Sequence, residues 1–137
     1  IDYKGRSISI SGDTIYDQNL VNNSKNVDVL FHESMSLELL DIINKGAKRT
    51  GNVVADIVTI DILDYHTPIV EVVKAANEAN VKHLVFYHHL PAPRNNIMED
   101  IMYRGVDDIR EGWTSSHDGT MVILPIGTEE IEITSVN

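Results

Sequence analysis

The chain has 137 residues, the size of one domain, and a chain of this length buries about two thirds of its unfolded surface. Hydrophobic residues make up 42% and charged residues 23%, as in soluble globular proteins, and no apolar run approaches the roughly 20 residues of a membrane helix. The 21 acidic and 11 basic residues give a net charge of -10, which opposes binding to nucleic-acid phosphates. These properties argue against a membrane protein and against a surface that grips RNA by itself.

Cysteine is absent, so the chain forms no disulfide and holds no metal through thiolates. Any transition metal must therefore be bound by histidine, aspartate or glutamate. The chain begins at Ile1, without an initiator methionine or an apolar leader, and strand-like residues follow within ten positions. We expect it to be the later part of a longer polypeptide, in which case a site shared between both parts is only half visible here.

Five segments have strand patterns. Residues 6–11 alternate between polar and apolar, which predicts a strand with one buried face. Residues 27–31 and 84–87 are short and mostly apolar, which is typical of inner parallel strands covered on both faces. Residues 121–126 and 130–134 flank Gly127 and predict a closing hairpin.

Helical patterns lie between these strands. They cover residues 37–45, 52–63 and 68–80 and a stretch opened by Asn96. We expect Gly46 to end the first of them and Ile97 to face the core in the last. Strands that alternate with helices predict an α/β fold, in which ligands bind beyond the carboxyl ends of the strands.

Two polar residues follow predicted strands and are candidates for metal ligands. Asp13 comes after Gly12, whose backbone freedom permits a sharp turn, and a carboxylate placed there can bridge two cations. The alternative is that Asp13 caps the next turn through Thr14. His88 follows the strand at 84–87, and imidazole is the commonest transition-metal ligand. The alternative is a hydrogen-bonded histidine at the sheet edge, with His89 pointing elsewhere.

Two further residues are candidates for catalytic roles. His66 precedes Thr67, the predicted N-cap of the helix at 68–80, where it could stabilise an oxyanion or protonate a leaving group. Its alternative role is a local cap. Glu33, with His32, ends the strand at 27–31 and could fix the tautomer of an imidazole by accepting a hydrogen bond from it. Its alternative role is to cap the following helix.

Four of these motifs, taken in order, resemble the C-terminal half of metallo-β-lactamase-fold hydrolases. The motifs are Ser11-Gly12-Asp13-Thr14, Val29-Leu30-Phe31-His32-Glu33-Ser34, Tyr65-His66-Thr67-Pro68 and Val81-Lys82-His83-Leu84-Val85-Phe86-Tyr87-His88. Within that superfamily the chain is similar to the branch of ribonuclease Z and the arylsulfatase-like enzymes. The resemblance implies that residues 1–137 are one partial domain, the C-terminal half of an αββα sandwich whose N-terminal half is absent from this chain.

The resemblance also implies an activity and roles for the candidate residues. Asp13 would bridge two divalent metal ions, His88 would bind the second, His66 would assist the leaving group or oxyanion, and Glu33 would orient His66. The ions would be zinc, or manganese or iron, and would activate a hydroxide. The substrate would be a small-molecule sulfate, phosphate or carboxylic ester.

Several departures from the family leave alternatives open. The family's His-x-His-x-Asp-His loop and its middle ligand histidine are not in this chain, so we expect an earlier segment to supply them. His66-Thr67-Pro68 lacks the family's serine, and Tyr87-His88-His89-Leu90-Pro91 replaces a threonine-histidine-phenylalanine run, which favours the arylsulfatase-like branch. A ribonuclease Z-like phosphodiesterase, the one alternative that involves nucleic acid, and a metal-free scaffold domain are the competing hypotheses. Because a lone half would expose an apolar sheet face, we also expect a homo-oligomer.

Overall fold

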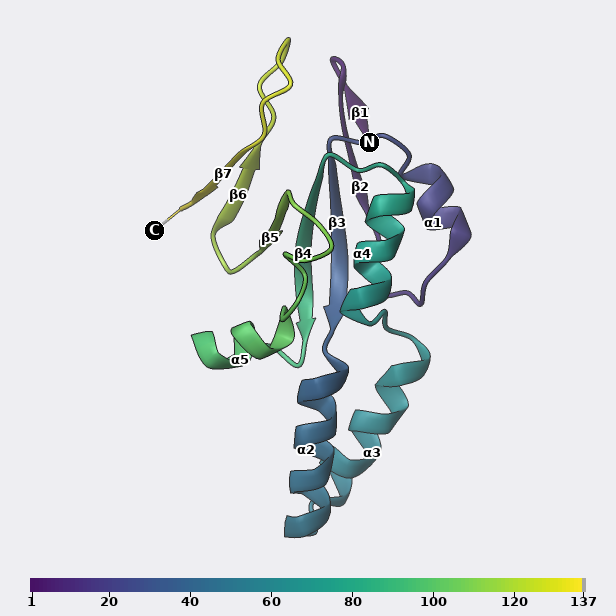
Figure 1. The fold of residues 1–137 in the computed structure, drawn as a ribbon, viewed down its shortest axis with the longest axis vertical. Coiled ribbons are helices and arrows are strands. Elements are labelled where there is room, and N and C mark those ends of the chain that lie inside the picture. Colours follow the sequence, from purple (N-terminus) through teal and green to yellow (C-terminus); the bar gives the residue numbers. More distant parts are fainter. Residues whose placement is uncertain (137) are drawn as a thin grey trace.

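The computed structural model describes residues 1–136, and its centre is a five-stranded sheet in the order β1-β2-β3-β4-β5 (Figure 1). Strands β2 (Arg6–Ile10), β3 (Val29–Met35), β4 (His83–Leu90) and β5 (Trp113–Ser115) run parallel, and β1 (Asp2–Tyr3) pairs antiparallel with β2. The prediction of an α/β fold with two inner parallel strands, β3 and β4, is confirmed. The sequence patterns did not reveal β1 or β5.

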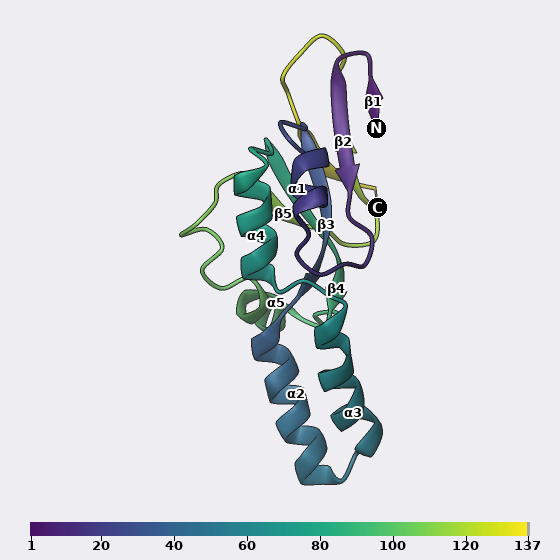
Figure 2. The ribbon, with the colours of Figure 1, turned by 90° about the vertical axis from the view of Figure 1, so that its right-hand side faces the viewer.

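The helices cover one face of the sheet and extend past one end of it. They are α1 (Gln18–Asn23), α2 (Leu37–Thr50), α3 (Val53–Asp61), the 3-10 turn η1 (Ile62–Asp64), α4 (Ile69–Glu78) and α5 (Asn96–Met102). Helices α1 and α4 lie on the same face, whereas α2 and α3 form a hairpin that projects beyond the carboxyl end of β3 (Figures 1 and 2). Within residues 1–136, no helix combines the length and the apolar character needed to cross a bilayer.

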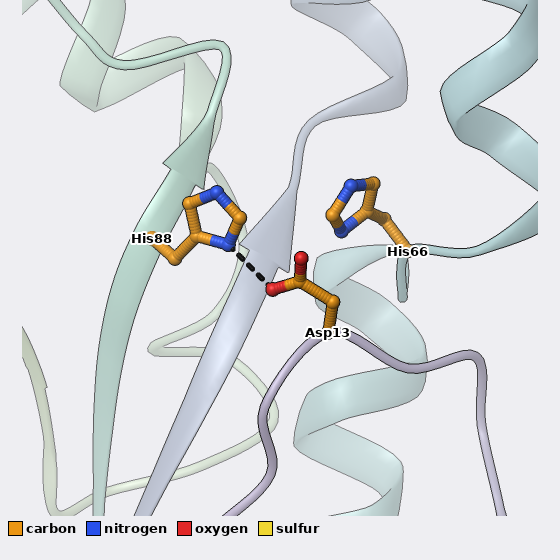
Figure 3. A group of neighbouring side chains, drawn as sticks. All are labelled: Asp13, His66 and His88. Carbon is orange, nitrogen blue, oxygen red and sulfur yellow. Dashed lines mark hydrogen bonds and ion pairs between the residues drawn. The ribbon is translucent and has the colours of Figure 1, made fainter.

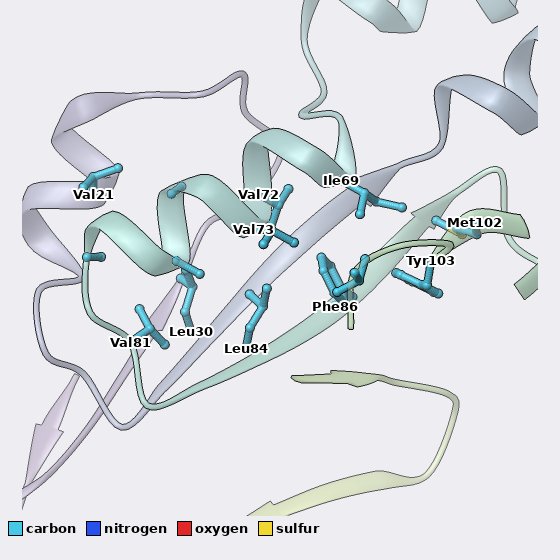
Figure 4. Close-up of a cluster of buried hydrophobic side chains, with 14 of the residues drawn as sticks. Val21, Leu30, Ile69, Val72, Val73, Val81, Leu84, Phe86, Met102 and Tyr103 are labelled. Atoms are coloured by element: carbon cyan, nitrogen blue, oxygen red, sulfur yellow. The ribbon is translucent and has the colours of Figure 1, made fainter. Parts of the chain in front are cut away.

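The core lies between α4 and the inner strands (Figure 4). The apolar stripe of α4 recurs at helical spacing and buries Val72 and Val73. It packs against Leu30 of β3 and Leu84 and Phe86 of β4, all of which are almost completely buried. Burying each such side chain stabilises the fold by roughly 1.5–3 kcal/mol. This packing therefore holds in place the strands whose carboxyl ends carry the candidate site.

A hairpin of β6 (Thr120–Ile123) and β7 (Glu132–Ser135) forms a separate two-stranded antiparallel sheet, as the pattern around Gly127 predicts. Arg6 attaches it to the main sheet. The guanidinium donates to the backbone oxygens of Pro125 at 3.1 Å and Thr128 at 2.7 Å, and also to the Asp28 carboxylate at 3.1 Å.

Two local predictions were wrong. Helix α2 does not stop at Gly46 but continues to Thr50 and ends at Gly51, which adopts a left-handed φ of 69°. The helix continues because Ala47, beyond Gly46, is buried, and one glycine inside a helix costs only about 1 kcal/mol. The sequence pattern also places Ile101 and Met102 on the inner side of α5, and both do contact the core, whereas Ile97, in the first turn, is 72% exposed.

Candidate metal centre

Asp13, His66 and His88 come together from three separate segments at the carboxyl end of the parallel strands (Figure 3). Each side chain offers one ligand atom, and these atoms lie within 4.8 Å of one another. Asp13 lies in the loop between β2 and α1, His66 lies between η1 and α4, and His88 belongs to β4. The edge of the sheet where ligands are expected therefore gathers one carboxylate and two imidazoles.

His88 reaches this group through a β-bulge. Tyr87 pairs with Glu33 and His89 pairs with Ser34, so His88 is an extra residue in β4 with no partner in the ladder, and its φ is 44°. A positive φ is uncommon for a residue other than glycine, and bulges redirect side chains beside functional sites. His88 Nδ1 lies 2.8 Å from Asp13 Oδ1. The prediction that the strand ends at Tyr87 was wrong, because β4 continues to Leu90.

The Asp13 turn is held against the neighbouring strands. Gly12 has a φ of 65°, as the predicted sharp turn requires, and its N–H donates to the Tyr87 hydroxyl at 3.1 Å. The Ser11 N–H donates to the backbone oxygen of Phe31 at 3.0 Å. The Asp13 carboxylate contacts His88, whereas helix α1 is capped by Asp17, so α1 does not need Asp13 as its cap.

Glu33 and His66 form a buried pair beside the exposed Asp13 and His88. Glu33 lies inside β3 rather than at its end, and its side chain is completely buried. Its Oε1 accepts the Thr67 N–H at 2.6 Å, and its Oε2 lies 3.5 Å from His66 Nδ1. Burial raises the pKa of the Glu33 carboxyl, against the opposing effect of the Thr67 N–H and of His66. Helix α2 is capped by Ser36, so the capping interpretation of Glu33 was wrong.

His66 is 4% exposed, and its ring packs edge-on against the His88 ring with centroids 5.5 Å apart. The predicted cap, Thr67, does not cap α4, because Pro68 occupies the N-cap position. The Thr67 hydroxyl instead donates to the backbone oxygen of Thr14, and this contact ties the segment of His66 to the loop of Asp13. A carboxylate beside Nδ1 favours a proton on that nitrogen and leaves Nε2 available to the site.

The remaining histidines near the sheet edge have structural partners. His32 lies inside β3 and is fully buried, and burial lowers its pKa to about 4, so its ring stays neutral at pH 7. His89 bonds to the Ser34 and Tyr103 hydroxyls through Nδ1 and to the Ser116 backbone oxygen through Nε2. His89 points elsewhere, as predicted, because the extra residue His88 places it opposite Ser34 rather than on the face shared by Tyr87 and Glu33.

The sequence patterns did not single out Tyr87. Its position opposite Glu33 in the ladder gives it a place on the same face of the sheet, and its hydroxyl reaches Gly12. Period-two alternation along β4 was the available signal, because it separates Tyr87 from the core residue Phe86. Tyr87 also lines an open cavity of about 700 Å³ beside His88, together with His117 and Asp118. A cavity of that size has room for a small molecule.

The donor set suits a transition metal. Imidazole nitrogens and carboxylate oxygens are ligands for zinc, manganese and iron. Asp13, His66 and His88 are the residues that could hold an ion, and His66 Nδ1 and Glu33 Oε2 are buried atoms with no hydrogen-bond partner in the described residues. Such orphaned polar atoms need a compensating charge or proton nearby. The candidate ligand atom of His66 lies within 4.8 Å of those of the two predicted ligands, so His66 could also contribute to holding an ion.

Of three comparisons with known proteins, one finds a similar structure. No family model and no curated protein matches the chain. Among solved structures, the chain is similar to the metallo-β-lactamase-fold protein YhfI from Bacillus subtilis, with 14% identity and a TM-score of 0.49. The match covers 80% of this chain but 36% of YhfI, so the chain spans little more than a third of that protein's length.

Proposed function

We propose that the protein is a metal-dependent hydrolase of the metallo-β-lactamase fold. The observation that carries the proposal is the convergence of Asp13, His66 and His88, from three separate segments, at the carboxyl edge of a parallel sheet. Two features support it further. A bulge in β4 directs His88 to this point, and a buried carboxylate stands behind His66.

In this proposal Asp13 and His88 would be the residues that hold divalent ions, zinc or else manganese or iron. Two bound cations lower the pKa of water and stabilise the attacking and leaving oxygens of an ester. The chain supplies three donors, and the remaining ligands come from a segment outside these residues that completes the αββα domain. The Tyr87 hydroxyl and the Thr67 contact hold the Asp13 loop in place.

His66 either completes the ligand set or transfers a proton. Glu33 Oε2 lies 3.5 Å from Nδ1. In the doubly protonated form of His66 both ring nitrogens carry a proton, and the one that does not face Glu33 could donate to a leaving oxygen or stabilise an anionic one. A buried carboxylate keeps that imidazole in a single orientation.

The substrate is a small sulfate, phosphate or carboxylic ester, as in the arylsulfatase-like branch. The cavity of about 700 Å³ beside His88 is lined by Tyr87, His117 and Asp118 and matches the size of small-molecule sites. The net charge of -10 disfavours an RNA substrate, because RNA affinity depends on neutralising phosphates. A tRNA precursor cleaved in preference to small aryl sulfates would reverse this choice.

Elemental analysis of the protein at its natural length tests the proposal. We expect about two ions of zinc, manganese or iron per protein, as in two-metal hydrolases, and a loss of metal in Asp13→Ala and His88→Ala. Asp2→Ala is the matched control, because Asp2 is an exposed acid on β1 with no part in the site. A wild type that stays free of metal after incubation with zinc would favour the metal-free scaffold instead.

A second measurement concerns the role of His66. In the metal-loaded protein, His66→Ala is compared with wild type for metal content and for hydrolysis of aryl sulfates, phosphates and esters. Retained metal with lost turnover supports the proton-transfer role, whereas lost metal assigns His66 to the ligand set.

A further inference from the structure

Helix α3 carries an apolar stripe on the side that faces away from the molecule. The residues of the stripe and their exposed fractions are Val53 66%, Val54 72%, Ile57 62% and Ile60 55%. At 100° per residue these four side chains share one side of the helix, with Ile57 near the middle of the stripe. An exposed patch of contiguous apolar side chains marks a contact with something else.

The stripe is not the side of α3 that packs inside the hairpin, because the opposite side of α3 already packs against α2. Thr59 is buried there, and the Asn44 side chain of α2 donates to its hydroxyl at 2.8 Å and to Asp56 Oδ1 at 2.7 Å. The hairpin projects away from the sheet in both views, with no other element over α3 (Figures 1 and 2). The stripe is therefore presented on a fixed helix.

The charges beside the stripe have opposite signs at its two ends. The tip of the hairpin carries the exposed cations Lys48 and Arg49, at the end of α2 and next to the start of α3. Lys48 also lies 3.7 Å from the Asp56 carboxylate of its own chain, so Arg49 is the cation with no ion pair within residues 1–136. The base carries the exposed anions Asp61 and Asp64, at the end of α3 and in η1. Turning a second hairpin by 180° would bring the tip of one copy to the base of the other, so the surface is complementary to itself.

We propose that α3 is the contact between two copies of this chain, packed antiparallel about a twofold axis near Ile57. The stripes then bury one another, and Lys48 and Arg49 of each copy face Asp61 and Asp64 of the other. The net charge of -10 is unfavourable for the other common occupants of such a face, an anionic membrane or nucleic acid.

The contact is small. A standard stable interface buries about 800 Å² per partner, more than one nine-residue helix supplies. The association is therefore weak and depends on protein concentration, with a dissociation constant on the order of micromolar rather than nanomolar.

Cross-linking tests the geometry directly. These 137 residues contain no cysteine, so Ile57→Cys introduces a single thiol next to the proposed axis. A disulfide requires Cα atoms about 4.4–6.8 Å apart, which two helices in contact near Ile57 satisfy. The protein is used at its natural length, with any cysteine outside these residues replaced. We expect Ile57→Cys to form a covalent dimer under mild oxidation at a rate at least tenfold above that of Ile97→Cys. Ile97 lies on α5 and is more exposed than Ile57, at 72% against 62%, so accessibility alone would favour the control.

Sedimentation equilibrium tests the association without a cross-link. We expect Ile57→Asp to weaken dimerisation at least tenfold with an unchanged far-ultraviolet circular dichroism spectrum, because the side chain is already exposed. The double change Lys48→Glu with Arg49→Glu should also weaken it, and adding Asp61→Lys with Asp64→Lys should restore it. A wild type that remains monomeric at 100 µM overturns the proposal, as does a dimer that Ile57→Asp leaves intact, since α3 would then be free or covered by something else.

Discussion

The Tyr87 hydroxyl accepts the Gly12 N–H at 3.1 Å and thereby joins the two segments that carry the facing residues Asp13 and His88. Tyr87 directly precedes the bulged His88, and Gly12 directly precedes Asp13. This hydrogen bond therefore helps to set how far apart the carboxylate and the imidazole lie, together with the contacts of Ser11 and Thr67 that hold the same loop. Both side chains are substantially exposed, so little other packing restrains them.

Tyr87→Phe should weaken metal binding without unfolding the protein. The change removes one hydrogen bond, worth about 0.5–1.5 kcal/mol, or roughly 2- to 12-fold in affinity. Competition with a chromophoric chelator measures the affinity. Tyr16→Phe is the matched control, because the Tyr16 hydroxyl bonds to Glu78, away from the site, at 2.7 Å. Equal affinities in wild type and Tyr87→Phe would show that the turn is held by other contacts.

The buried Glu33 side chain should stabilise the fold, and two substitutions separate the effect of its hydrogen bond from that of its charge. Glu33→Ala leaves the buried Thr67 N–H without its acceptor, which costs about 1–3 kcal/mol, plus a further cost for the cavity. Glu33→Gln keeps an oxygen in that position and should cost less. Urea denaturation at pH 7 measures the unfolding free energy of both variants. Glu38→Gln is the control, because Glu38 is an exposed glutamate paired with Arg104.

The pH dependence of Glu33 has a defined sign. Burial raises its folded pKa above that of the unfolded chain, so its stabilising effect is present below the unfolded pKa of about 4.3 and is lost as pH rises through the folded value. As pH rises above the unfolded pKa, wild type should therefore lose stability relative to Glu33→Gln, which has no carboxyl to ionise. If the unfolding free energies of the two proteins changed with pH by the same amount, ionisation of Glu33 would have no effect on stability and the prediction would be wrong.

Asp28 should show the opposite dependence. Burial raises its pKa, but hydrogen bonds from Lys82, the Ser7 N–H and Arg6 outweigh burial and hold the pKa at about 2. Its stabilising effect is thus present above the unfolded pKa of about 3.9 and is lost as pH falls through the folded value. The difference corresponds to roughly 2–3 kcal/mol.

Asp28→Asn should therefore lower the unfolding free energy by about 2–4 kcal/mol at pH 7, because it also leaves the buried Arg6 without its anion. The difference from wild type should narrow between pH 4 and pH 2, as urea denaturation at several pH values would show. Asp41→Asn, which breaks an exposed pair with Lys45, should change the unfolding free energy by less than about 0.5 kcal/mol. A difference from wild type that stays constant down to pH 2 would mean that the carboxylate is not stabilised as described.

The inner strands and α4 could be predicted from the sequence because their signals are local. Apolar runs in β3 and β4, and the helical spacing of Val72 and Val73, follow directly from which faces are buried. The continuation of β3 through Glu33 could not be predicted in this way. A buried carboxylate inside a strand depends on the Thr67 N–H, which arrives from 34 residues further along the chain.

The same distinction applies to the candidate site. Asp13, His66 and His88 were each proposed from their position after a strand or before a helix, and the structure brings them together, although their roles remain proposals. The bulge that directs His88 was not predictable, because it is a property of the register between two strands rather than of either strand alone.

Two glycines of the α2–α3 hairpin should respond oppositely to alanine. Gly46 lies inside α2 with open space around its Cβ position, so Gly46→Ala should stabilise the protein by about 0.5–1 kcal/mol through helix propensity. Gly51 ends the helix with a φ of 69°, where alanine is strained, so Gly51→Ala should destabilise the protein by about 1 kcal/mol. Thermal unfolding monitored by circular dichroism compares the two variants. Because neither glycine has a Cβ neighbour within 4 Å, a loss of stability in Gly46→Ala would mean that α2 is interrupted there after all.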